Sequence, residues 1–202
     1  MIVEYEKVNT PEELMLFMNK YIKYGFHGID GVNYTNDGSN EQNEIFQKAV
    51  GSVYGLASPD YLLTYGIGHC WDQVELERDW FTKHNYEFKT NFIWFLFDYD
   101  NNYSTHTYLI YKDKITNEYC LFEHADYDNR GIHRFKSYKE AVIFQMNKHI
   151  EYNKKQGNLI NDEVLSHLHI YEYIKPKYGI NMMEFLDNIL ESKDITNIIR
   201  GD

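Results

Sequence analysis

Three residues of the types that perform nucleophilic catalysis occur in the order cysteine, histidine, glutamate: Cys70, His106 and Glu123. A catalytic thiol needs a base within hydrogen-bond reach and a third group that orients the base. Cys70 follows a glycine-containing turn, Tyr65–Gly68, and begins a helix predicted over about residues 70–84. The partial positive charge and unpaired N–H groups of a helix N-terminus stabilise a thiolate, and they can also bind an oxyanion. The sequence therefore predicts a reactive thiol at Cys70.

His106 and Glu123 lie on two strands that are predicted to be neighbours. If the connection Lys112–Asn117 is centred midway, the numbers of paired residues sum to about 229, and His106 lies opposite Glu123. Opposite residues share a face with Cβ atoms about 5 Å apart, so a carboxylate there can hold an imidazole nitrogen. A one-residue slip would bring His124 opposite instead. We therefore predict a His106–Glu123 pair, with His124 and Asp126 as reserve candidates for the carboxylate position.

The remaining cysteine and histidines are interpreted as structural. Strand parity directs Cys120 to the face opposite Glu123, so we expect it to be a small buried hydrophobic residue. His167 and His169 share one face of a predicted strand at a spacing that metals accept, but zinc needs a third and usually a fourth ligand. His69 is expected only to begin the helix. No metal site is predicted.

Capping signals mark the helices that must position these side chains. Thr10 and Pro11 begin an amphipathic helix, with Glu13 completing a capping box and Gly25 in the left-handed conformation just past its end. A loop is predicted from Gly28 to Asn43. Further helices are predicted over about residues 44–54, 58–65, 137–153 and 181–190.

Aromatic and β-branched residues dominate the middle of the chain and indicate an antiparallel sheet. The strands are predicted over residues 86–89, 91–98, 104–111 and 118–124, with 131–136 and 168–174 in addition. The aromatic run 92–97 is interpreted as core, and Glu75, Glu77 and Asp79 are expected to include a solvated helix face. Without a linker or an internal repeat, one α+β domain over residues 1–202 is the simplest architecture.

Composition restricts the class of protein. The 202 residues are 43% hydrophobic, which is enough for a compact core, and 20 basic against 31 acidic residues give a net charge of −11. That charge argues against nucleic acid and anionic membranes as partners. The N-terminus lacks a signal-peptide pattern, and no window approaches the ~20 apolar residues that span a bilayer. We expect a soluble cytoplasmic protein with two reduced cysteines.

The segment Gly68–Gln73 opening a helix, then His106 on a strand and Phe122–Glu123 on the next, resembles the Cys…His…Asp/Glu order of the transglutaminase-like proteins. These belong to the papain-like cysteine protease superfamily, and the resemblance covers approximately residues 50–135. It implies an α+β fold whose catalytic helix packs on an antiparallel sheet of about four to six strands with flanking helices. It also implies that Cys70 is the nucleophile, His106 the general base and acid, and Glu123 the orienting residue, where the commoner residue is Asp.

The activity implied by this resemblance is acyl transfer from an amide in a peptide, protein or small molecule. The Cys70 thiolate attacks the acyl carbon, and His106 passes a proton to the leaving amine. Water or another amine then releases the thioester, so hydrolysis, deamidation and transglutamination are all open. The Cys70 N–H and a second upstream donor would form the oxyanion hole, with Tyr61, Tyr65 and polar loop residues as candidates. No cofactor is implied. The alternative is a non-catalytic member that binds a peptide or partner in the same cleft.

Overall fold

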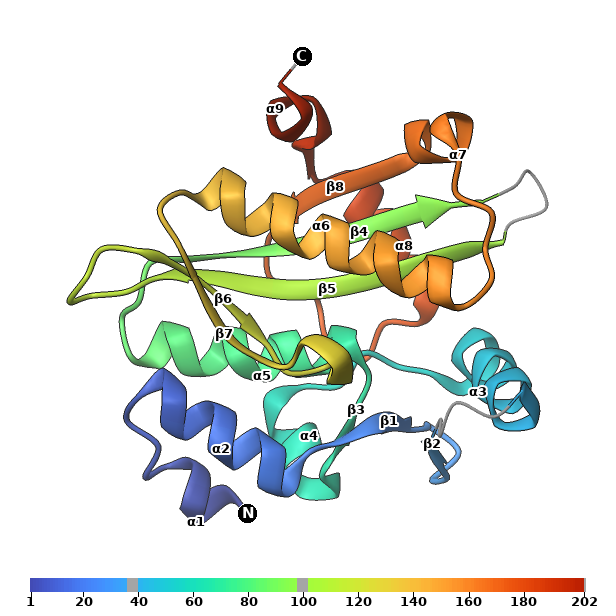
Figure 1. Cartoon of the computed structure of the whole chain (residues 1–202). Helices are drawn as coiled ribbons and strands as arrows, with labels where there is room; N and C mark the ends of the chain where they lie inside the picture. Colours follow the sequence, from blue (N-terminus) through green and yellow to red (C-terminus); the bar gives the residue numbers. More distant parts are fainter. Residues whose placement is uncertain (36–39, 98–101, 202) are drawn as a thin grey trace. The chain divides into compact units, whose positions relative to one another are not determined.

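The chain, described by a computed structural model over residues 1–35, 40–97 and 102–201, is α+β (Figure 1). The side chains of residues 40 and 41 are not described. Contacts divide the chain into two compact units. Unit 1 comprises Met1–Asn85, His124–Arg130 and Lys175–Asn188, and unit 2 comprises Tyr86–Glu123, Gly131–Ile174 and Ile189–Asp202. Each unit thus draws on segments that are distant in sequence.

Unit 1 is mainly helical. Its helices are α1 (Ile2–Tyr5), α2 (Pro11–Tyr21), α3 (Asn40–Val53), α4 (Pro59–Tyr65), α5 (Cys70–Lys83), the 3-10 turn η1 (Tyr127–Asn129) and most of α8 (Met182–Leu190). A small sheet pairs β1 (Lys23–His27) antiparallel with β2 (Asn33–Thr35) and parallel with β3 (Ile67–Gly68). The predicted loop 28–43 therefore contains a short strand and the start of α3, while its residues 36–39 lie outside the described ranges.

Helix α2 begins with Thr10 as its N-cap and Pro11 as its first residue, as expected, but the predicted capping box and the predicted end are wrong. The Thr10 side chain accepts the Glu13 N–H at 3.1 Å, whereas the Glu13 carboxylate accepts from Asn9, one residue before the predicted partner. Gly25 is not a helix cap and lies within β1 at φ +143°. A Cβ there would lie 2.3 Å from the backbone oxygen of Tyr34. The glycine is thus needed for the close approach of β2.

The turn before Cys70 forms as the sequence predicts. Ser58 caps α4, and Gly66 ends it in the left-handed conformation at φ +68°, so that the chain reverses through β3 into α5. The expected solvated face of α5 is wrong for Glu75 and Glu77, which are both buried. Glu75 accepts from the guanidinium of Arg78 at 3.0 Å, because a buried carboxylate requires such a partner.

Unit 2 is built on a six-stranded antiparallel sheet with the order β7–β6–β5–β4–β8–β9. The strands are β4 (Phe88–Leu96), β5 (Tyr103–Lys112), β6 (Tyr119–Glu123), β7 (Gly131–Phe135), β8 (Leu168–Tyr173) and β9 (Lys193–Asp194). The helices are α6 (Tyr138–Lys155), α7 (Asp162–Ser166) and α9 (Thr196–Arg200). The two strands predicted over 86–89 and 91–98 are thus one strand, β4.

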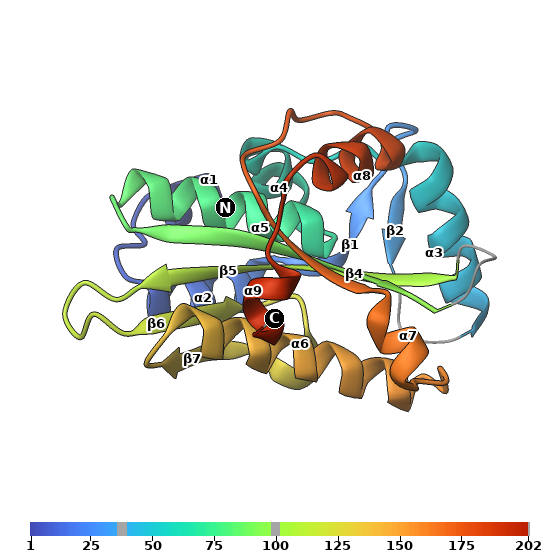
Figure 2. The ribbon, with the colours of Figure 1, turned by 90° about the horizontal axis from the view of Figure 1, so that it is seen from above.

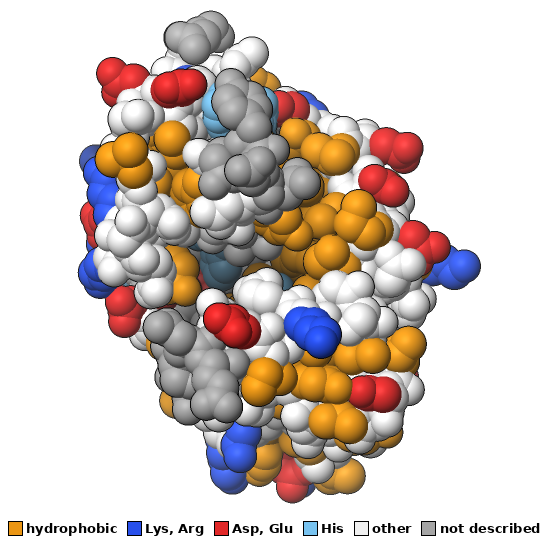
Figure 3. All heavy atoms as spheres, turned by 90° about the vertical axis from the view of Figure 1, so that its right-hand side faces the viewer, with side chains coloured by type: hydrophobic (Ala, Val, Ile, Leu, Met, Phe, Trp, Pro, Cys, Tyr) orange, Lys and Arg blue, Asp and Glu red, His pale blue; other side chains and the backbone are white. Residues whose placement is uncertain are grey.

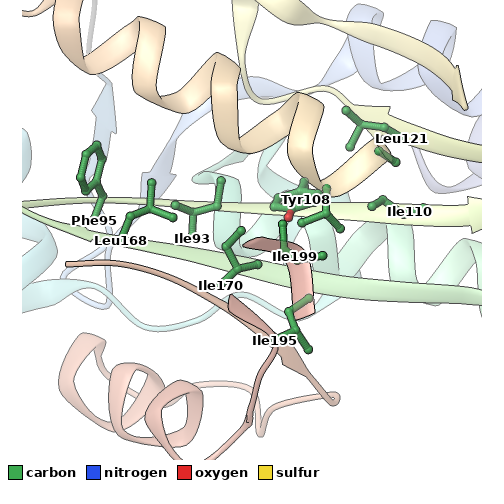
Figure 4. Close-up of a cluster of buried hydrophobic side chains, with 11 residues drawn as sticks. Ile93, Phe95, Tyr108, Ile110, Leu121, Leu168, Ile170, Ile195 and Ile199 are labelled. Carbon is green, nitrogen blue, oxygen red and sulfur yellow. The ribbon is translucent and has the colours of Figure 1, made fainter. Parts of the chain in front are cut away.

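Helix α6 covers one face of this sheet, as Figures 1 and 2 both show. Between them lies an apolar cluster to which β4, β5, β6, β8, α6 and α9 all contribute (Figure 4). Its members include Ile93, Tyr108, Leu121, Ile170 and Ile199, each at most 3% exposed. Burying such side chains contributes roughly 1.5–3 kcal/mol each. This core fixes the face on which the even-numbered residues of β5 point.

On the face drawn in Figure 3, Lys and Arg side chains are scattered and interspersed with Asp and Glu. Within the described ranges, no helix combines the length and the apolar character needed to cross a membrane.

Candidate active site

His106 and Glu123 meet inside unit 2. The Nε2 atom of His106 lies 2.7 Å from Oε2 of Glu123, and both side chains are at least nine-tenths buried. His106 belongs to β5 and Glu123 ends β6, the neighbouring strand. At this distance the carboxylate can fix the orientation of the imidazole and stabilise its protonated form.

The contact forms although the predicted register is wrong. Observed pairs such as Leu109 with Phe122 have numbers that sum to 231, not 229, so Glu123 is level with residue 108. The connection runs from Asp113 to Glu118, one residue later at each end, and Asn117 turns the chain at φ +58°. An error of two residues leaves every side chain on its predicted face, because the period of a strand is two.

The diagonal arrangement explains why a glutamate at position 123 can reach His106. Directly opposite Cβ atoms are about 5 Å apart, whereas diagonal neighbours are roughly 7–8 Å apart and need longer side chains to touch. Glu123 is two residues off the position opposite His106, and its carboxylate nevertheless reaches the ring at 2.7 Å. The extra methylene relative to Asp supplies that reach.

Two residues of α6 complete this cluster and were missed from the sequence. Gln145 Nε2 donates to Glu123 Oε2 at 3.0 Å, and the His149 ring centroid lies 6.0 Å from that of His106. Burial, and secondly the charge of His106, lower the pKa of His149 to about 3, so its ring is neutral at neutral pH. The signal in the sequence that could have identified Gln145 and His149 is their spacing of four residues, which places two polar side chains on the core face of the predicted helix.

Cys70 is the first residue of α5 and lies in unit 1. Its side chain is 1% exposed, and its sulfur lies 3.6 Å from Nδ1 and 3.9 Å from Nε2 of His69. The helix N-terminus and a neighbouring imidazole favour the thiolate, whereas burial opposes it. Cys70 and His106 belong to different units.

Asp72 anchors the turn that carries Cys70. Its carboxylate accepts the His69 N–H at 2.8 Å, the Ala57 N–H at 2.8 Å and the Tyr54 hydroxyl at 2.7 Å. Burial nevertheless raises the pKa of Asp72 to about 6, against the lowering effect of those donors. The carboxylate thus caps the start of α5 and also binds residues of the segment before α4. These contacts fix the backbone next to Cys70.

The reserve candidates have other roles. His124 Nδ1 lies 2.6 Å from Oε1 of Gln73, whose amide donates to the Gly68 carbonyl at 2.7 Å. Burial lowers the pKa of His124 to about 3, with help from the positive charge of Arg130. Asp126 caps η1 by accepting the Asp128 N–H. Both residues therefore have structural contacts within unit 1, and Glu123 is the carboxylate that pairs with His106.

The other predicted features are structural in the described ranges. Cys120 is fully buried in β6, and burial raises the pKa of its thiol. His167 lies before β8 begins, and His169 pairs with Asp194 at 3.0 Å, so the predicted shared strand face is wrong. Among the residues that the structure describes, no group of three or more His, Cys, Asp and Glu side chains could hold a metal ion.

The tyrosines considered as second oxyanion donors lie around His27. Tyr61 directs its hydroxyl to the His27 carbonyl at 3.5 Å, and Tyr65 stacks on the His27 ring at 3.8 Å.

We compared the chain with family models, with curated proteins and with solved structures, and none of the three comparisons finds a match.

Proposed function

We propose that this protein is a cysteine-dependent acyl-transfer enzyme that acts on an amide in a peptide, protein or small molecule. Cys70 is the nucleophile, His106 the general base and acid, and Glu123 the residue that orients His106. The observation that carries the proposal is the buried His106–Glu123 hydrogen bond of 2.7 Å. The resemblance to transglutaminase-like proteins, with a papain-like fold, supports it. A cytoplasmic location would keep the thiol reduced.

The ring of His106 has two nitrogens with different tasks in this proposal. Nε2 faces Glu123, so Nδ1 is the atom assigned to exchange a proton with the Cys70 thiol. Proton transfer from sulfur gives a thiolate and an imidazolium, and the carboxylate stabilises the positive charge. This stabilisation is needed because a buried charged group requires a charged or hydrogen-bonding partner.

The reaction then follows two balanced steps. The Cys70 thiolate adds to the acyl carbon, the oxyanion is bound by the N–H of Cys70 at the start of α5, and His106 protonates the departing amine. The resulting thioester is attacked by water or an amine, whose proton returns to His106 as the thiolate departs. Water gives hydrolysis or deamidation, and an amine gives transfer.

Thiol reactivity provides the direct test. In a Cys120→Ser background, Cys70 is the sole cysteine, and iodoacetamide labelling followed by mass spectrometry reports its rate. We expect His106→Ala to slow labelling at pH 7 at least tenfold, since the imidazolium partner of the thiolate is lost. The matched control is His133→Ala, which removes a half-buried histidine from β7 and should leave the rate unchanged.

A chemical probe separates the enzyme from a non-catalytic binding protein. p-Nitrophenyl acetate should acetylate Cys70, and water or glycine ethyl ester should then remove the acetyl group in a His106-dependent manner. The proposal is wrong if native Cys70 is labelled no faster than in the denatured chain and forms no acetyl-enzyme. Comparing water with the amine in the second step distinguishes hydrolysis from transfer.

A further inference from the structure

Helix α6 presents two buried polar side chains to the pair formed by His106 and Glu123. Gln145 is fully buried and His149 is 6% exposed, and they lie one helical turn apart on the core face of α6. Burying an amide costs free energy unless it is hydrogen-bonded, so such a residue at this place requires a partner. The partner is the carboxylate of Glu123, at 3.0 Å from the Gln145 nitrogen.

The hydrogen bonds from His106 and Gln145 to Glu123 converge on one oxygen. Oε2 lies 2.7 Å from His106 Nε2 and 3.0 Å from Gln145 Nε2. Because an ionised carboxylate only accepts, the Gln145 atom that faces it must be the NH₂ group, which fixes the orientation of the amide. The last torsion of a glutamate is broad and roughly two-fold. The hydrogen bond from the ring fixes one oxygen, and the amide donor from α6 adds a second restraint on the rotation of the carboxylate.

The chemical type of the α6 residues matters as much as their position. A Lys or Arg at position 145 would form an ion pair with Glu123 and compete with the imidazolium for its negative charge. The Gln145 amide holds the carboxylate without neutralising it. His149, neutral at neutral pH, likewise brings no positive charge against His106. Helix α6 thus supports the pair while leaving its charge balance unchanged.

We infer that Gln145 is a positioning residue for the site proposed above: through its hydrogen bond it holds the Glu123 carboxylate in the rotation that receives His106 Nε2. This inference rests on the proposed function for its consequence at Cys70, but the positioning itself is a property of unit 2. Gln145→Met tests it, because Met fills a similar volume in a helix and lacks the donor. The matched control on the same helix is Asn147→Ala, at an exposed position.

Two measurements in the Cys120→Ser background decide the inference. The first is the downfield proton resonance of the His106 Nε2–H, which should move upfield or broaden in Gln145→Met and stay in place in Asn147→Ala. The second is the pH profile of Cys70 labelling by iodoacetamide, which should move to higher pH, with a rate about tenfold lower at pH 7. A factor of ten corresponds to the loss of about one hydrogen bond to a charged group.

A folded Gln145→Met protein with an unchanged resonance and an unchanged pH profile would overturn the inference. Gln145→Ala supplies a second variant if the Met protein does not fold: water can enter the space and replace part of the donor, so a smaller change in the same direction is expected. If His106→Ala does not slow Cys70 labelling, the proposed function fails. The resonance in Gln145→Met still decides whether Gln145 positions the pair.

Discussion

Acid should destabilise this protein through His149, and replacing the residue should remove that contribution. The ring is buried between α6 and the sheet of unit 2, near His106. Burial lowers its pKa from 6.5 to about 3, while the unfolded chain returns the imidazole to its ordinary pKa. Between these two values the unfolded chain binds more protons than the folded one, so the free energy of unfolding falls as the pH falls.

The expected magnitude follows from the width of that window. Each pH unit below the ordinary pKa of 6.5 lowers the free energy of unfolding by about 1.36 kcal/mol, because protonation of His149 stabilises the unfolded chain. At pH 4.5, two units below that pKa, His149 therefore lowers the free energy of unfolding by about 3 kcal/mol relative to pH 7. That is a large fraction of the 5–15 kcal/mol typical of a folded domain. His149→Gln removes the titrating group. Between pH 7 and pH 4.5, the free energy of unfolding of the His149→Gln variant should therefore fall about 3 kcal/mol less than that of the native protein.

Urea unfolding at both pH values measures this difference. The other shifted groups in this range, His124 and Asp72, are common to both proteins and cancel in the comparison. Asn147→Ala is the matched control: it lies at an exposed position of the same helix and removes no titrating group, so this variant should lose as much stability as the native protein. Equal losses in the native protein and His149→Gln would refute the claim that a buried neutral His149 limits acid stability.

Two further predictions concern unit 1. Tyr54→Phe removes one of the three donors to the buried Asp72 carboxylate and should lower the free energy of unfolding by about 1 kcal/mol, measured by urea unfolding. Gly25→Ala should lower the free energy of unfolding by more than about 1 kcal/mol, because residue 25 has a φ of +143° and the added Cβ would lie 2.3 Å from the Tyr34 oxygen. Gly51→Ala on α3 should raise the free energy of unfolding by about 0.5–1 kcal/mol, because its Cβ would meet no atom within 4 Å. Equal melting temperatures for the two alanine variants would contradict the close approach at β1.

The helices with local start signals could be predicted from the sequence. Ser58 and Ser137 accept the backbone N–H three residues later, and Gly66 ends α4 in the left-handed conformation. These features depend on a few neighbouring residues, so tertiary structure does not have to be known. Gly25 shows the limit of the method: a glycine after a helix predicts a cap, but here it allows two strands to approach.

Burial on α5 could not be predicted from composition. Charged residues are usually exposed, yet Glu75 and Glu77 are buried, and Glu75 is held by Arg78 three residues away. The spacing of Glu75 and Arg78 was visible in the sequence, but it equally fits a surface pair. Which of the two occurs depends on what covers the helix, and that information lies in distant segments such as Lys175–Asn188.

The pair of His106 and Glu123 shows which part of a hairpin a sequence determines reliably. The face of each residue depends only on whether its distance from the turn is odd or even, while its exact partner depends on where the turn begins. The observed turn begins and ends one residue later than predicted, so the numbers of paired residues sum to 231 instead of 229. Because this change is even, each residue stays on its predicted face. A one-residue shift on one strand would have brought His124 to the face of His106. The glutamate tolerates the even shift because its side chain spans the diagonal, and Gln145 from α6 then holds the carboxylate there. A contact between a histidine and a carboxylate on neighbouring strands therefore tolerates a change of two in the sum of the paired numbers, provided that the acid is long enough and a third element holds it.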